Sequence, residues 1–107
     1  MNASPDDVEV SNNQAAHRYE ATVNGQLSVI NYQRTDGQIV YTHTEVPEEL
    51  EGHGIAARMA HAALEDARAQ GLSVIPRCPF VASYIQRHTE YMDLVPAEYR
   101  ARYLTRR

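Results

Sequence analysis

Two short turn signals constrain the fold of this chain more than any other feature. Asn24-Gly25 and Thr35-Asp36-Gly37 are typical of tight hairpin turns, because such turns need residues that tolerate positive φ. The segments around them, Arg18–Val23, Gln26–Arg34 and Gln38–Val46, are rich in β-branched and aromatic residues. The sequence therefore predicts three strands joined as an antiparallel meander.

The side-chain pattern of these strands predicts which residues share a face. In the second strand the apolar phase shifts between Val29 and Ile30, which favours a bulge or burial on both faces. In the third strand the two-residue period places Ile39, Tyr41 and His43 on one face.

The second half of the chain reads as helix, strand and helix. Pro47 ends the sheet ladder, and Ile55–Gln70 has the alanine content and periodicity of an amphipathic helix. Leu72–Ile75 is a short apolar strand, so this strand and the preceding one should run parallel. A second helix is expected from Cys78-Pro79 to about His88, and a short one over Ala97–Leu104. The fold class is α/β (α+β).

Length and composition limit the function classes. The 107 residues suit one domain, expected over residues 16–107, with residues 1–15 as a flexible tail and regular structure from near His17. A net charge of −4 argues against a nucleic-acid binder. One cysteine, Cys78, and the lack of an apolar N-terminal run indicate a soluble cytoplasmic protein without a membrane span. The oligomeric state is left open.

The loop before the first helix carries the main chemical signal. Glu51-Gly52-His53-Gly54-Ile55-Ala56-Ala57 joins a strand end to a helix start. Helix N-termini offer unpaired N–H groups and a partial positive charge, and two glycines let a phosphate approach the backbone. The loop therefore indicates a diphosphate site, with an ordinary glycine-containing turn as the alternative.

Taken together, these segments resemble the GNAT acetyltransferase superfamily, and more closely its small YjdJ-type members. The superfamily motif Arg/Gln-x-x-Gly-x-Gly/Ala corresponds to Glu51 through Ala56, with Glu51 replacing Arg or Gln. Segments His43–Pro47, Ile75–Val81 and Tyr84–His88 match the smaller family, so the resemblance extends from Tyr19 to Val95.

The resemblance implies an acetyl-CoA-dependent N-acyltransferase that acts on an unidentified amine. The pantetheine arm of coenzyme A is then expected along Thr44 to Val46, with the thioester near His43 and Cys78. The residues expected to bind the cofactor are Thr44, Glu45, Val46, Glu51, Gly52, His53, Gly54, Ile55, Ala56, Ala57 and Tyr84.

Two residues are candidates for catalysis. His43 suits a proton relay because imidazole titrates near neutral pH, although a histidine in a strand can also serve only as a cross-strand partner. Cys78 precedes a helix N-terminus, which favours the thiolate and permits a covalent route. The alternative is a small buried cysteine that lines the site. Tyr84 fits either the cofactor site or the core.

The sequence bears on three further classes of site or function. Gly52-x-Gly54-x-x-Ala57 also matches the dinucleotide fingerprint, but Pro47 to Glu51 separate it from its strand, and a single strand–helix–strand unit is too little for a doubly wound sheet. A non-catalytic acyl-CoA-binding or interaction module with the same fold remains open. The histidine spacing and the single cysteine exclude a zinc site.

Overall fold

A computed structural model describes residues 8–104 and contains one mixed five-stranded sheet. The strands follow one another in the sheet in chain order, β1-β2-β3-β4-β5. The first four pair antiparallel, and β5 runs parallel to β4. Their bounds are β1 Val10–Asn13, β2 Arg18–Val23, β3 Gln26–Thr35, β4 Gln38–Glu45 and β5 Ser73–Pro76.

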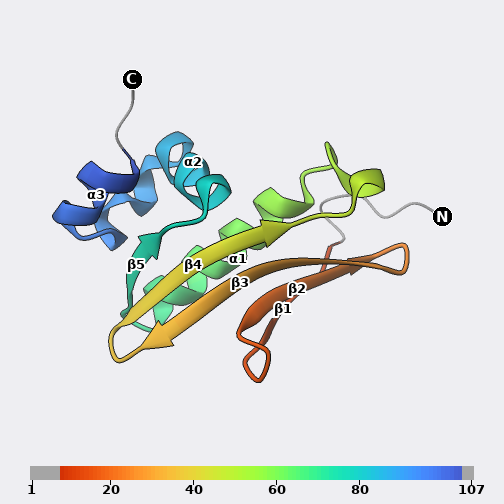
Figure 1. The fold of residues 1–107 in the computed structure, drawn as a ribbon, viewed down its shortest axis with the longest axis horizontal. Helices are drawn as coiled ribbons and strands as arrows, with labels where there is room; N and C mark the ends of the chain where they lie inside the picture. Colours follow the sequence, from red (N-terminus) through yellow and green to blue (C-terminus); the bar gives the residue numbers. More distant parts are fainter. Residues whose placement is uncertain (1–7, 105–107) are drawn as a thin grey trace.

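The helices follow the order predicted from the sequence. Figure 1 shows α1 lying behind the sheet, with α2 and α3 beyond the β5 edge. The expected meander, the long helix, the parallel strand and the two later helices are all confirmed. The bounds are η2 Glu48–Leu50, α1 Ile55–Ala69, α2 Pro79–Arg87, η3 Thr89–Leu94 and α3 Ala97–Tyr103.

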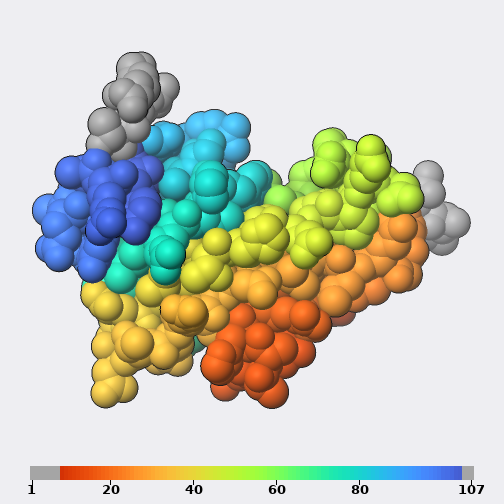
Figure 2. All heavy atoms as spheres, viewed as in Figure 1, coloured from red at the N-terminus to blue at the C-terminus, as the bar shows by residue number. Residues whose placement is uncertain are grey.

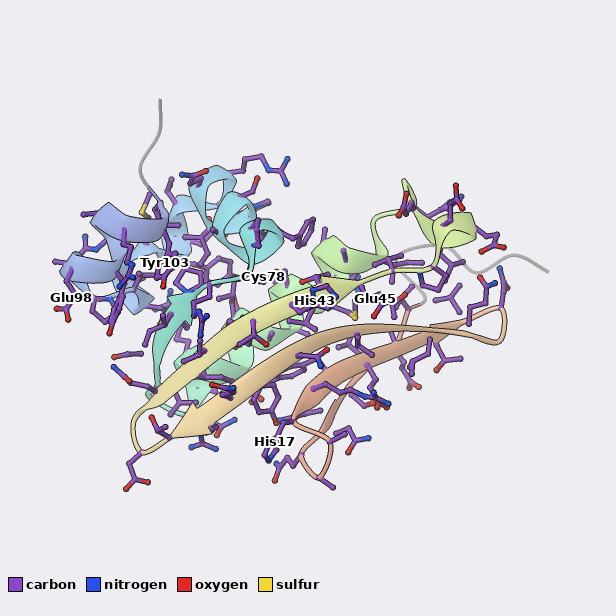
Figure 3. The ribbon with its side chains drawn as sticks, in the orientation of Figure 1. His17, His43, Glu45, Cys78, Glu98 and Tyr103 are labelled. Atoms are coloured by element: carbon purple, nitrogen blue, oxygen red, sulfur yellow. The ribbon has the colours of Figure 1, made fainter. Side chains whose placement is uncertain are left out.

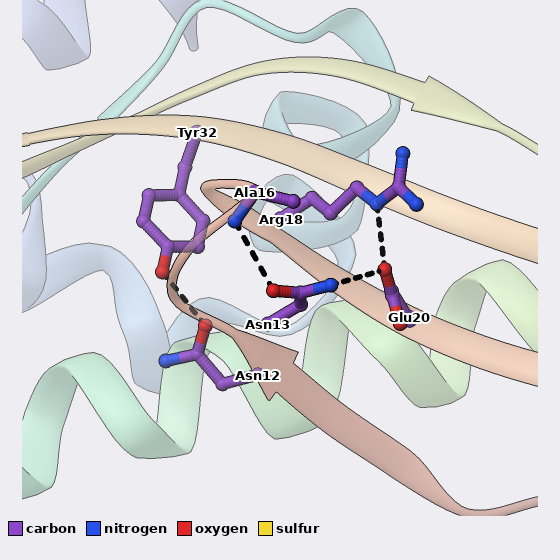
Figure 4. A network of polar contacts seen from close by, with 6 residues as sticks. All are labelled: Asn12, Asn13, Ala16, Arg18, Glu20 and Tyr32. Atoms are coloured by element: carbon purple, nitrogen blue, oxygen red, sulfur yellow. Dashed lines mark hydrogen bonds and ion pairs between the residues drawn. The ribbon is translucent and has the colours of Figure 1, made fainter.

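Strand β1 corrects the prediction that regular structure begins near His17. It pairs along its whole length with β2. Side chains hold it there, because Asn13 Nδ2 donates to Glu20 (2.9 Å) and Tyr32 donates its hydroxyl to Asn12 (2.7 Å) (Figure 4). Its polar residues show no two-residue period, so the sequence carried no strand signal. Residues 1–7 of the expected tail lie outside the described residues.

The core forms between α1 and one face of the sheet. Ile55, Met59, Ala63 and Ala67 are all buried, as the helical period predicts. The hydroxyl of Tyr41 in β4 donates to the carbonyl of Ala63 (2.8 Å) and so joins strand to helix. This contact marks the face of β4 that points toward α1.

A bulge interrupts β4. Asn31 of β3 pairs with His43, whereas the next residue, Tyr32, pairs with Tyr41, so Thr42 is an extra residue on β4. The prediction of a bulge in β3 is therefore wrong, because the bulge lies in β4. The apolar phase shift in β3 reflects burial on both faces, the alternative that the sequence also allowed.

The bulge reverses the side-chain phase at the end of β4. Residues opposite each other on paired strands share a face, and Thr44 pairs with the buried Ile30. Thr44 therefore points to the α1 side of the sheet, as Ile39 and Tyr41 do. His43 points to the other side, so the expectation that it shares their face is wrong.

Candidate functional site

Strands β4 and β5 separate after four residue pairs. Their pairing runs from Gln38 with Ser73 to Tyr41 with Pro76. The N–H of Cys78 then donates to the carbonyl of Tyr41 (2.8 Å), and the chain turns into α2. In the described part of the chain, no strand pairs with residues 42–45 of β4 on this side. A gap bordered by β4 and α2 therefore opens at the bulge.

A cleft of about 480 Å³ occupies this part of the molecule. Its walls are the end of β4, the segment from η2 into α1, and α2, and Figure 2 shows the surface hollowed between the teal atoms of α2 and the yellow-green loop. The lining residues are Thr44, Val46, Leu50, Glu51, Gly52, Gly54, Ile55, Ala56, Ala57, Phe80 and Arg87.

The N-terminus of α1 forms one end of the cleft. Gly54 precedes the helix with φ 78°, and Gly52 has φ 85°, both in the left-handed region that glycine tolerates. No side chain caps this helix end, and no acidic residue lies in its first turn. The first N–H groups of α1 therefore remain free for an anionic ligand.

The lining of the cleft is largely apolar. Val46, Ile55 and Phe80 form its walls, and Thr44 supplies a hydroxyl. Thr44 Oγ1 lies 2.9 Å from the Sγ of Cys78, at hydrogen-bonding distance. Cys78 is only 2% exposed and stands immediately before α2, as predicted. A ligand in the cleft thus meets the Thr44 hydroxyl directly, with the thiol behind it.

His43 and Glu45 lie outside the cleft lining. Their side chains are 64% and 75% exposed, and His43 Nε2 lies 3.9 Å from Glu45 Oε1. Figure 3 shows both on β4 and Cys78 near the start of α2. Because the bulge directs His43 to the opposite face from Thr44, the structure brings Thr44 and Cys78 together but does not add His43 to them.

Tyr84 and His53 also stand apart from the lining residues. Tyr84 is buried and stacks on His88, with ring centroids 3.9 Å apart. Burial, and then the carboxylate of Glu90, raise the pKa of Tyr84, so this phenol stays protonated at neutral pH. His53 is exposed in the loop. Both residues are therefore outside the cleft in this structure.

Three lining residues were not identified from the sequence as site residues: Leu50, Phe80 and Arg87. Phe80 and Arg87 are seven residues apart in α2, so they share one face of that helix. This seven-residue spacing was the signal in the sequence that could have placed Phe80 and Arg87 on one wall of the site. Arg58, one turn into α1, does not line the cleft.

Within residues 8–104, no group of three or more His, Cys, Asp or Glu side chains is placed to hold a metal ion. None of the helices there has the length and apolar character needed to cross a bilayer.

Among known protein families, the one described as GCN5-related N-acetyl-transferase matches residues 18–94. The matched region begins at β2 and ends with η3, so it contains the bulged strand, the glycine loop, α1 and α2.

Proposed function

Because the chain belongs to the GCN5-related N-acetyltransferase family, we propose that it transfers an acetyl group from acetyl-CoA to an amine. The observation that carries this proposal is the uncapped N-terminus of α1 at the end of an apolar cleft. When bound, acetyl-CoA supplies an activated thioester, and transfer forms a C–N bond, breaks the C–S bond and leaves a thiol.

The cleft fits such a ligand in two respects. The free N–H groups from Gly54 to Ala57 suit the diphosphate, because main-chain donors at a helix N-terminus favour negative charge. The apolar lining of the cleft suits the pantetheine arm, which we place along Thr44, Glu45 and Val46, where β4 has no partner strand toward β5.

The pair of Thr44 and Cys78 is our proposed position for the thioester. Thr44 offers a hydroxyl to the carbonyl or the sulfur, and Cys78 holds that hydroxyl in place through their contact. A covalent route through Cys78 is the second proposal for this residue. In it, the Cys78 sulfur takes the acetyl group and coenzyme A leaves as its thiol. Mass spectrometry after incubation with acetyl-CoA distinguishes a Cys78 that only positions the Thr44 hydroxyl from a Cys78 that carries the acetyl group. Only the covalent route adds an acetyl group to Cys78.

His43 is proposed as the proton relay, reached by an acceptor that enters from the face opposite α1. Its exposure and its neighbour Glu45 are compatible with a group that exchanges protons with solvent. Replacing His43 with Gln should lower turnover and change how turnover depends on pH, and should leave coenzyme A affinity unchanged. An unaltered pH profile would remove His43 from the mechanism.

One observation favours a second function, a non-catalytic acyl-CoA-binding or interaction module. Among the described residues that line the cleft, Glu51 and Arg87 are the only charged ones, and none is a histidine. A cleft without a histidine can bind the ligand and yet leave the acceptor amine protonated.

The experiment that separates these functions has two readings. Thermal melting with and without coenzyme A reports binding, and free thiol release from acetyl-CoA over a panel of small amines, peptides and polyamines reports transfer. Stabilisation with thiol release supports the transferase. Stabilisation without release on any acceptor supports the module, and no stabilisation at all excludes both.

Three finer expectations from the sequence stay proposals. They are the closer likeness to the YjdJ-type members, the cytoplasmic location, and the organisation of the chain as one domain.

A further inference from the structure

The loop sequence suggests a diphosphate site, but the charged side chain that the loop contributes to the cleft is acidic. Glu51 begins the glycine loop and lines the cleft, and it is exposed. A carboxylate that lines the cleft repels a diphosphate bound there, so the loop itself brings no side-chain charge that favours this ligand. A favourable cation has to come from another element.

Of the described residues that line the cleft, Arg87 is the only one with a cationic side chain. It lies in the last turn of α2, so it approaches from a different wall than the amides of α1. Within residues 8–104 its guanidinium makes no hydrogen bond or ion pair with the protein. By contrast, Arg18 is bound to Glu20 (2.7 Å) and Arg68 to Asp93 (3.0 Å).

A guanidinium suits this place for a geometric reason. It offers several N–H donors in one plane, which match the oxygens of a phosphate group, and it stays charged at every pH of interest. The free amides of α1 also donate to such a ligand. A diphosphate between the two walls can therefore accept from both.

We propose that Arg87 binds the diphosphate of coenzyme A from the α2 wall and offsets the charge of Glu51. This inference rests on the proposed function, because it assumes that coenzyme A is the ligand. It assigns to α2 a phosphate-binding residue that the loop sequence alone does not contain.

The test compares two ligands and three proteins by calorimetry. The ligands are coenzyme A and dephospho-coenzyme A, which share the diphosphate but differ in the 3′-phosphate. The proteins are the unaltered chain, Arg87→Gln, and Arg58→Gln as a matched control. Arg58 is also exposed, and within residues 8–104 its guanidinium also makes no hydrogen bond or ion pair, but it does not line the cleft.

Arg87→Gln should weaken both ligands by about tenfold, the usual size of one charge-assisted hydrogen bond, and Arg58→Gln should leave both within about twofold. Loss for coenzyme A alone would place Arg87 on the 3′-phosphate and overturn the proposal. So would equal effects of the two substitutions, or none from Arg87→Gln. If the unaltered chain binds neither ligand, the proposed function itself fails, which is a different result.

A salt titration gives an independent reading. Removing one phosphate contact should flatten the dependence of affinity on salt concentration for Arg87→Gln relative to the unaltered chain. Arg87→Lys should recover part of the affinity, since it keeps the charge but not the planar donor geometry. An unchanged salt dependence in Arg87→Gln would contradict the direct contact.

Discussion

The two ends of α1 carry the same residue type in the same backbone conformation, yet they do opposite things. Gly71 follows the helix with φ 70°, and Gly54 precedes it with φ 78°. At the C-terminal end the N–H of Gly71 donates to Arg68 and that of Leu72 to Ala67 (3.1 and 2.9 Å). These bonds satisfy the last carbonyls of the helix. At the N-terminal end no side chain satisfies the first N–H groups.

The side chains repeat this contrast. Near the C-terminal half of α1, the Tyr91 hydroxyl donates to Glu65 (2.6 Å) and lies 3.1 Å from His61. Arg68 binds Asp93 through two nitrogens, both at 3.0 Å. Paired groups stabilise the fold but have no capacity left for a ligand. The unpaired groups near the N-terminus contribute little to stability, and they are the ones available for binding.

The largest expected effect concerns the buried tyrosines of the core. The pKa values of five tyrosines are raised, chiefly by burial: Tyr19, Tyr32, Tyr41, Tyr84 and Tyr91. A raised pKa contributes stability that is complete below the unfolded value near pH 10 and is lost above it. Above that value the free energy of unfolding should fall as pH rises, because unfolding then releases protons from these tyrosines. Denaturant melts from pH 8 to about 12 would show this, and a flat profile would contradict it.

The next largest effect tests the N-terminal glycine. Gly54→Val forces a branched residue into the left-handed region and obstructs the free amides, so coenzyme A affinity should fall by about 100-fold. Gly71→Val is the matched control, because it introduces similar strain at the C-terminal end of α1. Calorimetry should show normal affinity for Gly71→Val and similar losses of stability in both. Equal loss of affinity would mean that the two ends do not differ in function.

A third prediction concerns the C-terminal half of α1, where we expect a loss of stability without a loss of coenzyme A affinity. Tyr91→Phe removes the hydroxyl that bonds to Glu65 and should lower the free energy of unfolding by about 1–2 kcal/mol. For a domain of this size, the melting temperature should fall by about 4–8 °C for each kcal/mol. Coenzyme A affinity should stay within about twofold. A weaker affinity with unchanged stability would contradict the view that the C-terminal end of α1 stabilises the fold and the N-terminal end binds the ligand.

The smallest effect concerns Glu51. Glu51→Gln removes a carboxylate that faces the cleft and should strengthen coenzyme A binding by about threefold at low salt, with less gain as salt is added. Glu49→Gln, on the exposed face of η2 and outside the cleft lining, is the control. If both substitutions raise affinity equally, the effect comes from net charge and not from the position of Glu51.

The parts of the fold that the sequence predicted depend on neighbours in the chain. The two glycine-containing turns and the alanine-rich helix with Gly71 at its end each need only a few consecutive residues. The start of α2 at Pro79 is equally local, because proline suits the first turn of a helix. The loop from Glu51 to Ala57 was recognised for the same reason.

The parts that the sequence missed depend on contacts between distant segments. Strand β1 is polar and is held by bonds to β2 and β3. The bulge at Thr42 follows from the register between β3 and β4, and it decides that Thr44 rather than His43 faces Cys78. No local period reports such a register, since one extra residue reverses every side chain beyond it.

By itself, the sequence determined the order of the elements and the glycine-flanked N-terminus of α1, because backbone preference and side-chain period act over a few residues. Only the tertiary structure decided which side chains line the cleft. It brought Arg87 of α2 to the same cleft as the amides of α1 and turned His43 away. The physical reason is that strand register and helix packing depend on the whole core, and they determine where each side chain points.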